Sequence, residues 1–274
     1  MNVDLKNKVT VITGAAQGIG ADIARFFGKE GARLALTDIE EEKLEAVARE
    51  IRRDGGEVLA VPGDVSRPES VEACVRKIME HYRRIDCLLN IAGICIAVPA
   101  EDVTYENWQK EFDVNVTGEF LWAQAVAKAS MIPGGGGAIV NFSAGSGLGA
   151  VLDQLSYVAS KHAVVGMTKE LAMEWGRFGI RTNCLTPGIT STAMTDQVER
   201  QDPEKIAARK KRIPLGKPCL PIELARVCAF LVSDCASHIN GLIMPVDGGT
   251  SAMYPGTSLP EKYRFNGVDV PAEI

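Results

Sequence analysis

The sequence predicts an α/β protein in which one doubly wound parallel sheet of about seven strands carries helices on both faces. Short apolar runs alternate with longer amphipathic segments along most of the 274 residues. The apolar runs show little polar alternation, as expected for strands that are buried on both faces of a parallel sheet. Their regular alternation with helices favours right-handed crossovers within a single domain.

The first half of the chain supplies four expected strands and four expected helices. The strands are expected at residues 9–13, 33–37, 58–61 and 86–90, and the helices at residues 18–30, 40–54, 68–83 and 106–129. The second half adds strands at 138–142, 180–185 and 242–246, and helices at 157–177, 202–212 and 222–233. No long linker or change of composition interrupts this order, so we expect one domain.

Composition and charge narrow the class of protein. Hydrophobic residues make up 46% and charged residues 24%, which is ordinary for a globular protein, and the net charge of −5 gives no sign of a basic face for nucleic acid. No apolar run approaches the roughly 18 residues of a membrane-spanning helix, and the first residues lack the apolar core of a signal peptide, so a cytoplasmic protein is expected. The seven Cys have no C-x-x-C spacing, and we expect neither a disulfide framework nor a metal site.

Tyr157 and Lys161 form the strongest catalytic signal. Four residues apart on an expected helix, their side chains share one face. A free Tyr has a pKa of about 10, and a nearby ammonium lowers it, which suits proton abstraction from an alcohol. Taken alone, the spacing is more often that of an amphipathic helix with a snorkelling Lys, and the rest of the chain changes this balance.

A glycine-rich turn joins the first strand to the first helix, in the sequence Thr13-Gly-Ala-Ala-Gln-Gly-Ile-Gly20. Such glycines let the backbone approach a pyrophosphate at a helix N-terminus. The G-x-x-x-G-x-G spacing differs from the general G-x-G-x-x-G fingerprint of Rossmann-type folds. We expect a dinucleotide site that includes Gly14, Gln17, Gly18, Ile19 and Gly20.

Asp38 ends the second expected strand. A carboxylate there can accept hydrogen bonds from the adenosine ribose and would repel a 2′-phosphate, which favours NAD over NADP. Neither Gln17 nor Ile39 offers a compensating cation. The alternative is that Asp38 only terminates the strand.

Six motifs in this order together resemble the short-chain dehydrogenase/reductase family. They are residues 13–20, Asp64-Val65, residues 90–93 (Asn-Ile-Ala-Gly), Asn115, residues 157–161 (Tyr-Val-Ala-Ser-Lys) and residues 187–192 (Pro-Gly-Ile-Thr-Ser-Thr). The resemblance covers residues 5 to about 249. It implies an NAD-binding and catalytic domain at residues 1–249, with residues 250–274 as a C-terminal extension.

The resemblance also implies roles for individual residues. Asp64 and Val65 should bind the adenine, Asn90 and Gly93 should line the adenosine side, and Pro187, Ile189 and Thr192 should form the nicotinamide end. Tyr157 should remove the hydroxyl proton while hydride leaves the same carbon for the nicotinamide. Lys161 should lower the pKa of Tyr157 and bind the nicotinamide ribose, and Asn115 should anchor a water that relays the proton.

One position departs from the family pattern. The family carries a Ser 13 residues before the Tyr, where it binds the substrate oxygen, and here that position is Ala144. Ser146 shares the parity of residue 144 and lies in a Gly-rich loop, whereas Ser143 should point the other way. Ser146, Ser143 or no serine at all remain the alternatives for this donor.

The substrate region and the tail are less specific. Pocket candidates are Ile94, Cys95, Val151 and Gln154, and a segment between residues 192 and 220 is expected to cover the substrate. Its cations at residues 209–212 either attract an anionic substrate or form a solvated helix face. We expect residues 250–274 to pack on a neighbouring subunit. Family members are usually tetramers, so the resemblance also implies a homotetramer.

The sequence therefore predicts an NAD-dependent short-chain alcohol dehydrogenase that oxidises a secondary hydroxyl of a sugar, polyol or cyclic alcohol. Two alternatives stay open. One is an NAD-binding regulator or scaffold with weak catalysis, suggested by Ala144. The other is a ketone or enoyl reductase, because the sequence does not fix the direction of the reaction.

Overall fold

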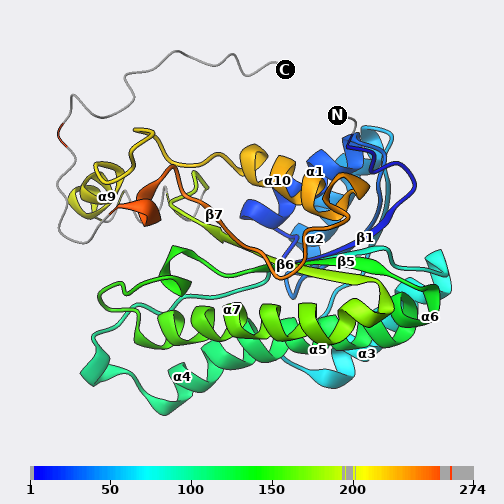
Figure 1. Cartoon of the computed structure of the whole chain (residues 1–274), viewed down its shortest axis with the longest axis horizontal. Helices are drawn as coiled ribbons and strands as arrows, with labels where there is room; N and C mark the ends of the chain where they lie inside the picture. Colours follow the sequence, from blue (N-terminus) through cyan, green and yellow to red (C-terminus); the bar gives the residue numbers. More distant parts are fainter. Residues whose placement is uncertain (1–2, 193–194, 196–199, 201, 254–259, 261–274) are drawn as a thin grey trace.

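The computed structural model describes residues 3–192, 195, 200, 202–253 and 260, and its centre is a parallel sheet (Figure 1). Seven strands pair in the order β3-β2-β1-β4-β5-β6-β7, which confirms the expected doubly wound fold. The strands are β1 (Val9–Thr13), β2 (Arg33–Thr37), β3 (Glu57–Ala60), β4 (Cys87–Asn90), β5 (Gly137–Phe142), β6 (Ile180–Pro187) and β7 (Ile243–Val246).

Helices cover both faces of the sheet. One face carries α1 (Gly18–Lys29), α2 (Glu41–Arg53) and α10 (Pro221–Val232) (Figure 1). The other carries α3 (Pro68–Tyr82), α5 (Gly118–Val126) and α7 (Leu155–Trp175), and α4 (Tyr105–Phe112) and α9 (Pro203–Lys210) lie toward one end. Short 3₁₀ turns at Ala100–Asp102, Gly145–Gly147, Gly176–Phe178, Asp234–Ala236 and Thr250–Ala252 complete the described elements.

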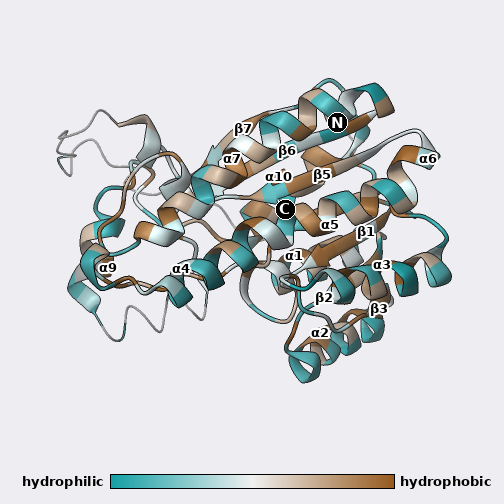
Figure 2. Ribbon diagram, turned by 90° about the horizontal axis from the view of Figure 1, so that it is seen from below, coloured by the Kyte–Doolittle hydropathy of each residue, from teal (hydrophilic) through white to brown (hydrophobic). Residues whose placement is uncertain are grey.

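The core consists of two apolar layers, one on each side of the sheet. Successive strand residues point to opposite faces, so Leu89 packs in the layer with α1 while Leu88 packs in the layer with α3 and α5. Both are fully buried, and each contributes about 1.5–3 kcal/mol through loss of exposed apolar surface. Figure 2 shows hydrophobic residues along the strands and hydrophilic residues along the outer sides of α2 and α3.

The expected helix at residues 106–129 is longer and less regular than predicted. A π-helical turn η2 (Asp113–Thr117) joins α4 to α5, and a second one, η3 (Ala127–Met131), joins α5 to α6 (Ile132–Gly134). A π turn inserts an extra residue into the helical repeat and is frequent at functional sites. Asn115 lies in the first of them.

The sheet reverses its order between β1 and β4, and the loops after these strands meet there. The Thr13 hydroxyl accepts hydrogen bonds from the backbone N–H groups of Ile91 (2.9 Å) and Ala92 (3.1 Å). Gly14 has a φ of +67°, and a Cβ on it would lie 2.8 Å from the Ala92 Cα. Ligands of open α/β sheets bind at such a switch point, outside the carboxyl ends of the strands.

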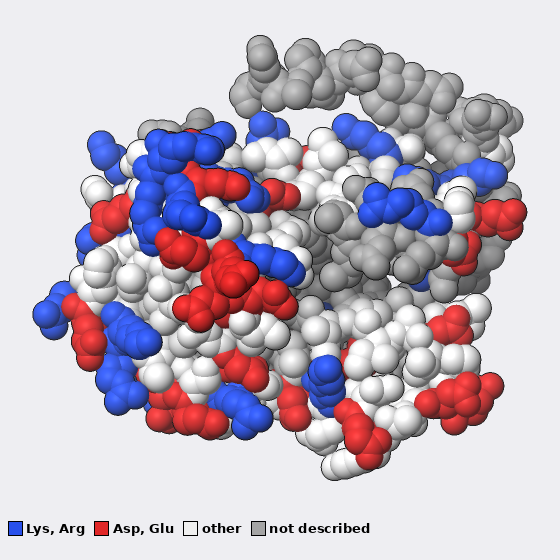
Figure 3. Space-filling view, turned by 180° about the vertical axis from the view of Figure 1, so that it is seen from behind, with Lys and Arg blue, Asp and Glu red and all other residues white. Residues whose placement is uncertain are grey.

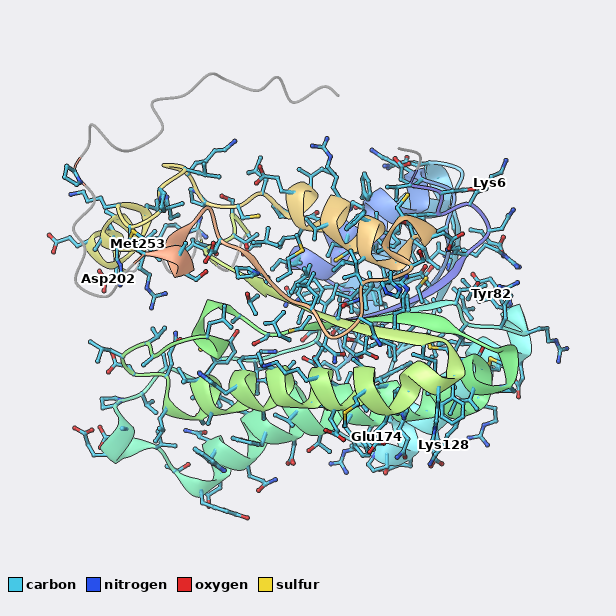
Figure 4. The ribbon with its side chains drawn as sticks, in the orientation of Figure 1. Lys6, Tyr82, Lys128, Glu174, Asp202 and Met253 are labelled. Carbon is cyan, nitrogen blue, oxygen red and sulfur yellow. The ribbon has the colours of Figure 1, made fainter. Side chains whose placement is uncertain are left out.

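The segment after β6 lies at the same end of the molecule as the start of α7. In Figure 4, Asp202, which precedes α9, and Met253, which follows the last 3₁₀ turn, lie at this end, while Lys6 and Tyr82 lie at the opposite one. Apart from residues 250–253 and 260, the C-terminal extension lies outside the described residues, so its expected contact with a neighbouring subunit stays a prediction.

Candidate active site

Helix α7 brings Tyr157 and Lys161 together on one face, with the Lys161 ammonium 6.0 Å from the centre of the Tyr157 ring. Lys161 is only 3% exposed. Its Nζ donates to the Phe142 carbonyl at 2.6 Å and lies 3.4 Å from Glu119 Oε1. The ammonium is therefore directed at the end of β5 and the start of α5.

Burial dominates the surroundings of the Tyr157 phenol. Burial raises the pKa of the phenol above its ordinary value, and negative charge at Cys95, Glu111 and Glu119 raises it further. The Lys161 ammonium, expected to lower this pKa, contacts the Phe142 carbonyl and Glu119 in this structure. A nearer ammonium or a further positive charge is needed before the phenolate forms near neutral pH.

Asn115 ties the loop after β4 to helix α7. Its Oδ1 accepts from the Ile94 N–H at 2.8 Å, and its Nδ2 donates to the Ile94 carbonyl at 2.9 Å and to Ser160 Oγ at 3.1 Å. Gly93 packs closely beside it: a Cβ there would lie only 3.2 Å from Asn115 Oδ1 and 3.5 Å from Lys161 Nζ. Glycine at this position therefore lets the loop after β4 approach both side chains closely.

Two glutamates extend this contact into a row of contacts, the ladder, between the continuous segment α4–η2–α5 and helix α7. Glu111 accepts from the Ile96 N–H at 2.7 Å and, through its other oxygen, from the Ser156 hydroxyl. Glu111, Asn115 and Glu119 thus face Ser156, Ser160 and Lys161. Sequence reasoning missed Glu111, Glu119, Ser160 and Thr13. The available signal was the recurrence of polar residues every four positions on a helix that is otherwise apolar on this side.

The two candidate serines are both turned away from open space. Ser143 donates its hydroxyl to the Lys161 carbonyl at 2.8 Å. Ser146 lies in the 3₁₀ turn Gly145–Gly147 and is 6% exposed, and its Oγ is buried with no hydrogen-bond partner among the described residues. Ala144 between them is half-buried. In this arrangement, neither hydroxyl is presented to a substrate.

The glycine-rich turn fits a dinucleotide pyrophosphate. A Cβ on Gly20 would overlap the Gly14 carbonyl, so the turn can be this tight only with glycine there. Gly18 has a φ of +58° and has no atom within 4 Å of the position of a Cβ, which leaves the N-terminus of α1 open to an anion. Gln17 precedes the helix with an extended backbone, and Ile19 packs against the core.

Two carboxylates expected on the adenosine side follow β2 and β3. Asp38 accepts from the Ala16 N–H at 3.0 Å and from the Glu40 N–H at 3.1 Å, which fixes the end of β2 to the glycine-rich turn. Asp64 accepts from the Ser66 N–H at 2.9 Å and from its hydroxyl at 2.6 Å.

Val65 and Asn90 support this side from the interior. Val65 is buried against Gly118. The Asn90 amide donates to the Glu119 carbonyl at 3.2 Å and to Asn141 Oδ1 at 3.0 Å. The Asn90 side chain is 1% exposed, so it braces β4 against β5 and the start of α5.

The residues expected to form the nicotinamide end lie in the segment after β6. Pro187 ends the strand, the Ile189 carbonyl accepts from the Cys219 N–H at 2.8 Å, and Thr192 Oγ1 lies 3.2 Å from Thr195 Oγ1. Residues 193–194, 196–199 and 201 of the expected covering segment lie outside the described residues. The expected cations at 209–212 begin on α9. Burial raises the pKa of the Cys95 thiol to about 11, and the charge of Arg209 opposes this rise.

Two loops that carry the expected pocket residues meet each other. Val98 bridges to Gln154, and its N–H donates to the Asp153 carbonyl at 2.8 Å, so the loop with Ile94 and Cys95 meets the one with Val151. Among the described residues, no group of three or more His, Cys, Asp or Glu is placed to hold a metal ion. None of the described helices is long and apolar enough to cross a membrane. Acidic and basic side chains are interspersed on the face in Figure 3, where the described residues form no continuous basic surface.

Comparison with known proteins agrees with this geometry. Residues 14–251 match a family profile described as enoyl-(acyl carrier protein) reductase. The chain is 39% identical over 245 residues to D-threitol dehydrogenase of Mycolicibacterium smegmatis, covering 89% of this chain and 93% of that one. It is 38% identical over 247 residues to NAD-dependent glycerol dehydrogenase of Listeria innocua, covering 90% and 94%.

Solved structures show the same fold. A crystal structure with NADP at low occupancy, of a Beutenbergia cavernae protein described as an NAD(P)-dependent gluconate 5-dehydrogenase, superposes with a TM-score of 0.87. That protein is 34% identical, and the match covers 92% of this chain and 99% of the other.

Proposed function

Because this chain belongs to the short-chain dehydrogenase/reductase family, we propose that it is an NAD-dependent alcohol dehydrogenase that oxidises a secondary hydroxyl to a ketone, reversibly. The observation that carries the proposal is the placement of Tyr157, Lys161 and Asn115 at the carboxyl edge of the sheet, beside the glycine-rich turn. Two relatives that match nearly the whole chain are a threitol and a glycerol dehydrogenase by name, which favours sugars and polyols as substrates.

In this proposal, Tyr157 accepts the hydroxyl proton of the alcohol as the C–H electron pair leaves the same carbon as hydride. NAD, when bound, would supply the hydride acceptor and the positive charge of its oxidised nicotinamide ring. Lys161 stabilises the phenolate once its ammonium turns from the Phe142 carbonyl toward Tyr157 and the ribose. The proton then passes to a water that Asn115 anchors beside helix α7.

The cofactor preference rests on charge at the end of β2. Asp38 is followed by Glu40, Glu41 and Glu42, and Lys43 is paired with Glu40 at 3.2 Å. A 2′-phosphate would meet this acidic group without an unpaired cation from the same segment. We therefore infer a preference for NAD, although relatives of this fold use either NAD or NADP.

The assembly and location are part of the same proposal. Phe120 on α5 and Met173 on α7 are 39% and 73% exposed on the helical layer that faces away from the sheet. Apolar side chains in such positions suit contacts between subunits. A cytoplasmic homotetramer remains our expectation.

A second candidate function is an NAD-binding regulator with weak catalysis. Ala144 and the engaged or buried hydroxyls of Ser143 and Ser146 favour it, because the substrate oxygen lacks a serine donor. Retention of Tyr157 and Lys161 favours the enzyme, since binding alone does not need an acid/base phenol. A ketone or enoyl reductase would use the same residues in the opposite direction.

The test is a rate screen of polyols, sugars, cyclic alcohols and ketones with NAD(H) and with NADP(H), using the wild type and Tyr157→Phe. We expect NAD-dependent turnover of a secondary alcohol, and a loss of roughly 10²–10⁴-fold in Tyr157→Phe. The matched control is Tyr105→Phe, which alters an exposed Tyr. Turnover of Tyr157→Phe within a few-fold of wild type would contradict the catalytic role. Tight NAD binding without turnover of any compound would favour the regulator.

A further inference from the structure

A buried carboxylate lies against the Lys161 ammonium and has no part in the chemistry described above. Glu119, in the first turn of α5, is 3% exposed, as is Lys161. Its Oε1 lies 3.4 Å from Lys161 Nζ. Charges at this depth are little screened by solvent or salt, so the state of one strongly affects the other.

The backbone of Glu119 is held in place, but only one of its two carboxylate oxygens has a partner among the described residues. Its backbone carbonyl accepts from the Asn90 amide at 3.2 Å, which fixes the start of α5 against β4. Its Oε2 has no hydrogen-bond partner among the described residues. Burying an unpaired carboxylate oxygen is costly, so protonation of this oxygen would relieve the cost.

Several elements place ionisable groups around this carboxylate. Helix α7 contributes Lys161 and Tyr157, strand β6 contributes Cys184, and Glu111 on α4 acts on the same Tyr157. Burial raises the pKa of Glu119 to about 8, and Lys161 opposes this rise. The pKa of the Cys184 thiol is raised to about 12, mainly by burial and to a smaller extent by the charge of Glu119.

We propose that Glu119 is a positioning residue for Lys161, whose ionised carboxylate holds the ammonium toward the Phe142 carbonyl and away from the Tyr157 phenol. When Glu119 is protonated, the ammonium keeps its full charge and is free to approach the phenol. The Glu119–Lys161 pair thus has a net charge of zero when Glu119 is ionised and of +1 when it is protonated. The pKa of Tyr157 is lower in the second state. This inference rests on the proposed function through the role of Tyr157.

The first experiment measures the pKa of Glu119 and its dependence on Lys161, and it does not require substrate turnover. Infrared difference spectroscopy follows the band of protonated carboxyl groups during a pH titration, and the part that disappears in Glu119→Gln belongs to Glu119. We expect a midpoint near 8 in the wild type. Lys161→Met should raise that midpoint by about one unit or more, because the charged form loses its cation. An unchanged midpoint in Lys161→Met would overturn the coupling.

The second experiment measures the effect on Tyr157. Alcohol oxidation needs the phenolate, so kcat/KM rises with pH as Tyr157 loses its proton. In Glu119→Gln we expect this rise at a pH lower by about one unit, the order expected for one unit charge several ångströms away. Glu119→Asp keeps the charge and should retain the wild-type profile. Glu170→Gln removes the same charge from an exposed position on α7 and should change nothing.

The outcomes separate this inference from the proposed function. A Glu119→Gln profile that coincides with the wild type would overturn the positioning role, even where the alcohol is turned over. Failure of the wild type to oxidise any alcohol would contradict the proposed function, and the infrared titration would still decide whether Glu119 and Lys161 are coupled. Circular dichroism of each variant checks that it is folded.

Discussion

At the scale of single residues, the site is governed by which polar groups are already engaged. The Lys161 ammonium donates hydrogen bonds to the Phe142 carbonyl and to the Glu119 carboxylate. The Ser143 hydroxyl donates to the Lys161 carbonyl. Ser146 is buried without a partner in the described part of the chain. Position 144, where the resemblance to the family leads us to expect a serine for the substrate oxygen, is an alanine without a hydroxyl.

Ala144→Ser should restore that hydroxyl. The Ala144 backbone is extended and the residue is half-buried, so a serine hydroxyl fits without strain. We expect kcat/KM for the preferred alcohol to rise by roughly tenfold or more, because loss of one such donor in other enzymes costs about 3–4 kcal/mol of transition-state stabilisation. Steady-state kinetics with saturating NAD measures the effect.

Ser146→Ala is the control for this change. Removing a buried hydroxyl without a partner should leave the rate unchanged and should not lower the free energy of unfolding. A large fall in rate in Ser146→Ala, together with no gain in Ala144→Ser, would show that Ser146 moves to supply the donor.

At the scale of elements, side chains at the ends of strands and on paired helices hold the site in register. The ladder from Glu111 to Lys161 spans α4, η2, α5 and α7, and the π turn at η2 carries its middle rung. On the cofactor side, Thr13 at the end of β1 accepts two backbone hydrogen bonds from the loop after β4. Neighbouring elements are thus joined through hydroxyl and carboxylate acceptors.

Thr13→Val should weaken the contact between the end of β1 and the loop after β4. The variant keeps the shape of the side chain but leaves the N–H groups of Ile91 and Ala92 without their acceptor, at a cost of about 1–3 kcal/mol of unfolding free energy. We expect the dissociation constant of NAD, measured by calorimetry, to rise about tenfold. Thr13→Ser keeps the hydroxyl and should bind NAD like the wild type. Equal affinities in all three proteins would contradict this role of Thr13.

At the scale of the whole molecule, burial of Glu119 links global stability to pH. In the unfolded chain a Glu ionises near its ordinary pKa of about 4.3, whereas in the folded chain burial raises the pKa to about 8. Between these values the native state binds the extra proton. Its stabilising contribution is thus fully present below the lower value and is lost as the pH rises through the upper one.

Urea unfolding at pH 5 and at pH 9 tests this linkage. Glu119→Gln cannot ionise, so we expect its stability relative to the wild type to improve by a few kcal/mol between the two pH values. Glu170→Gln, altered at an exposed position, is the control and should follow the wild type. A constant difference between wild type and Glu119→Gln at both pH values would contradict the linkage.

The sequence by itself determined the features that depend on the local period and chemistry of the chain. Buried strands, the glycine-rich turn before α1, the acidic end of β2 and the shared face of Tyr157 and Lys161 all follow from spacing along one segment, and the sheet order confirms the expected fold. The role of each site residue in turnover stays a prediction that the experiments above address.

Only the tertiary structure decided which groups engage one another across segments. Glu119 and Lys161 are separated by 42 residues, and their contact depends on how α5 packs on α7 after a π turn has shifted the helical register. The direction of the Ser143 and Ser146 hydroxyls likewise depends on where the loop after β5 meets α7. Helix packing and buried charge are properties of the folded molecule, so no pattern within a single segment could reveal that Lys161 faces a carboxylate.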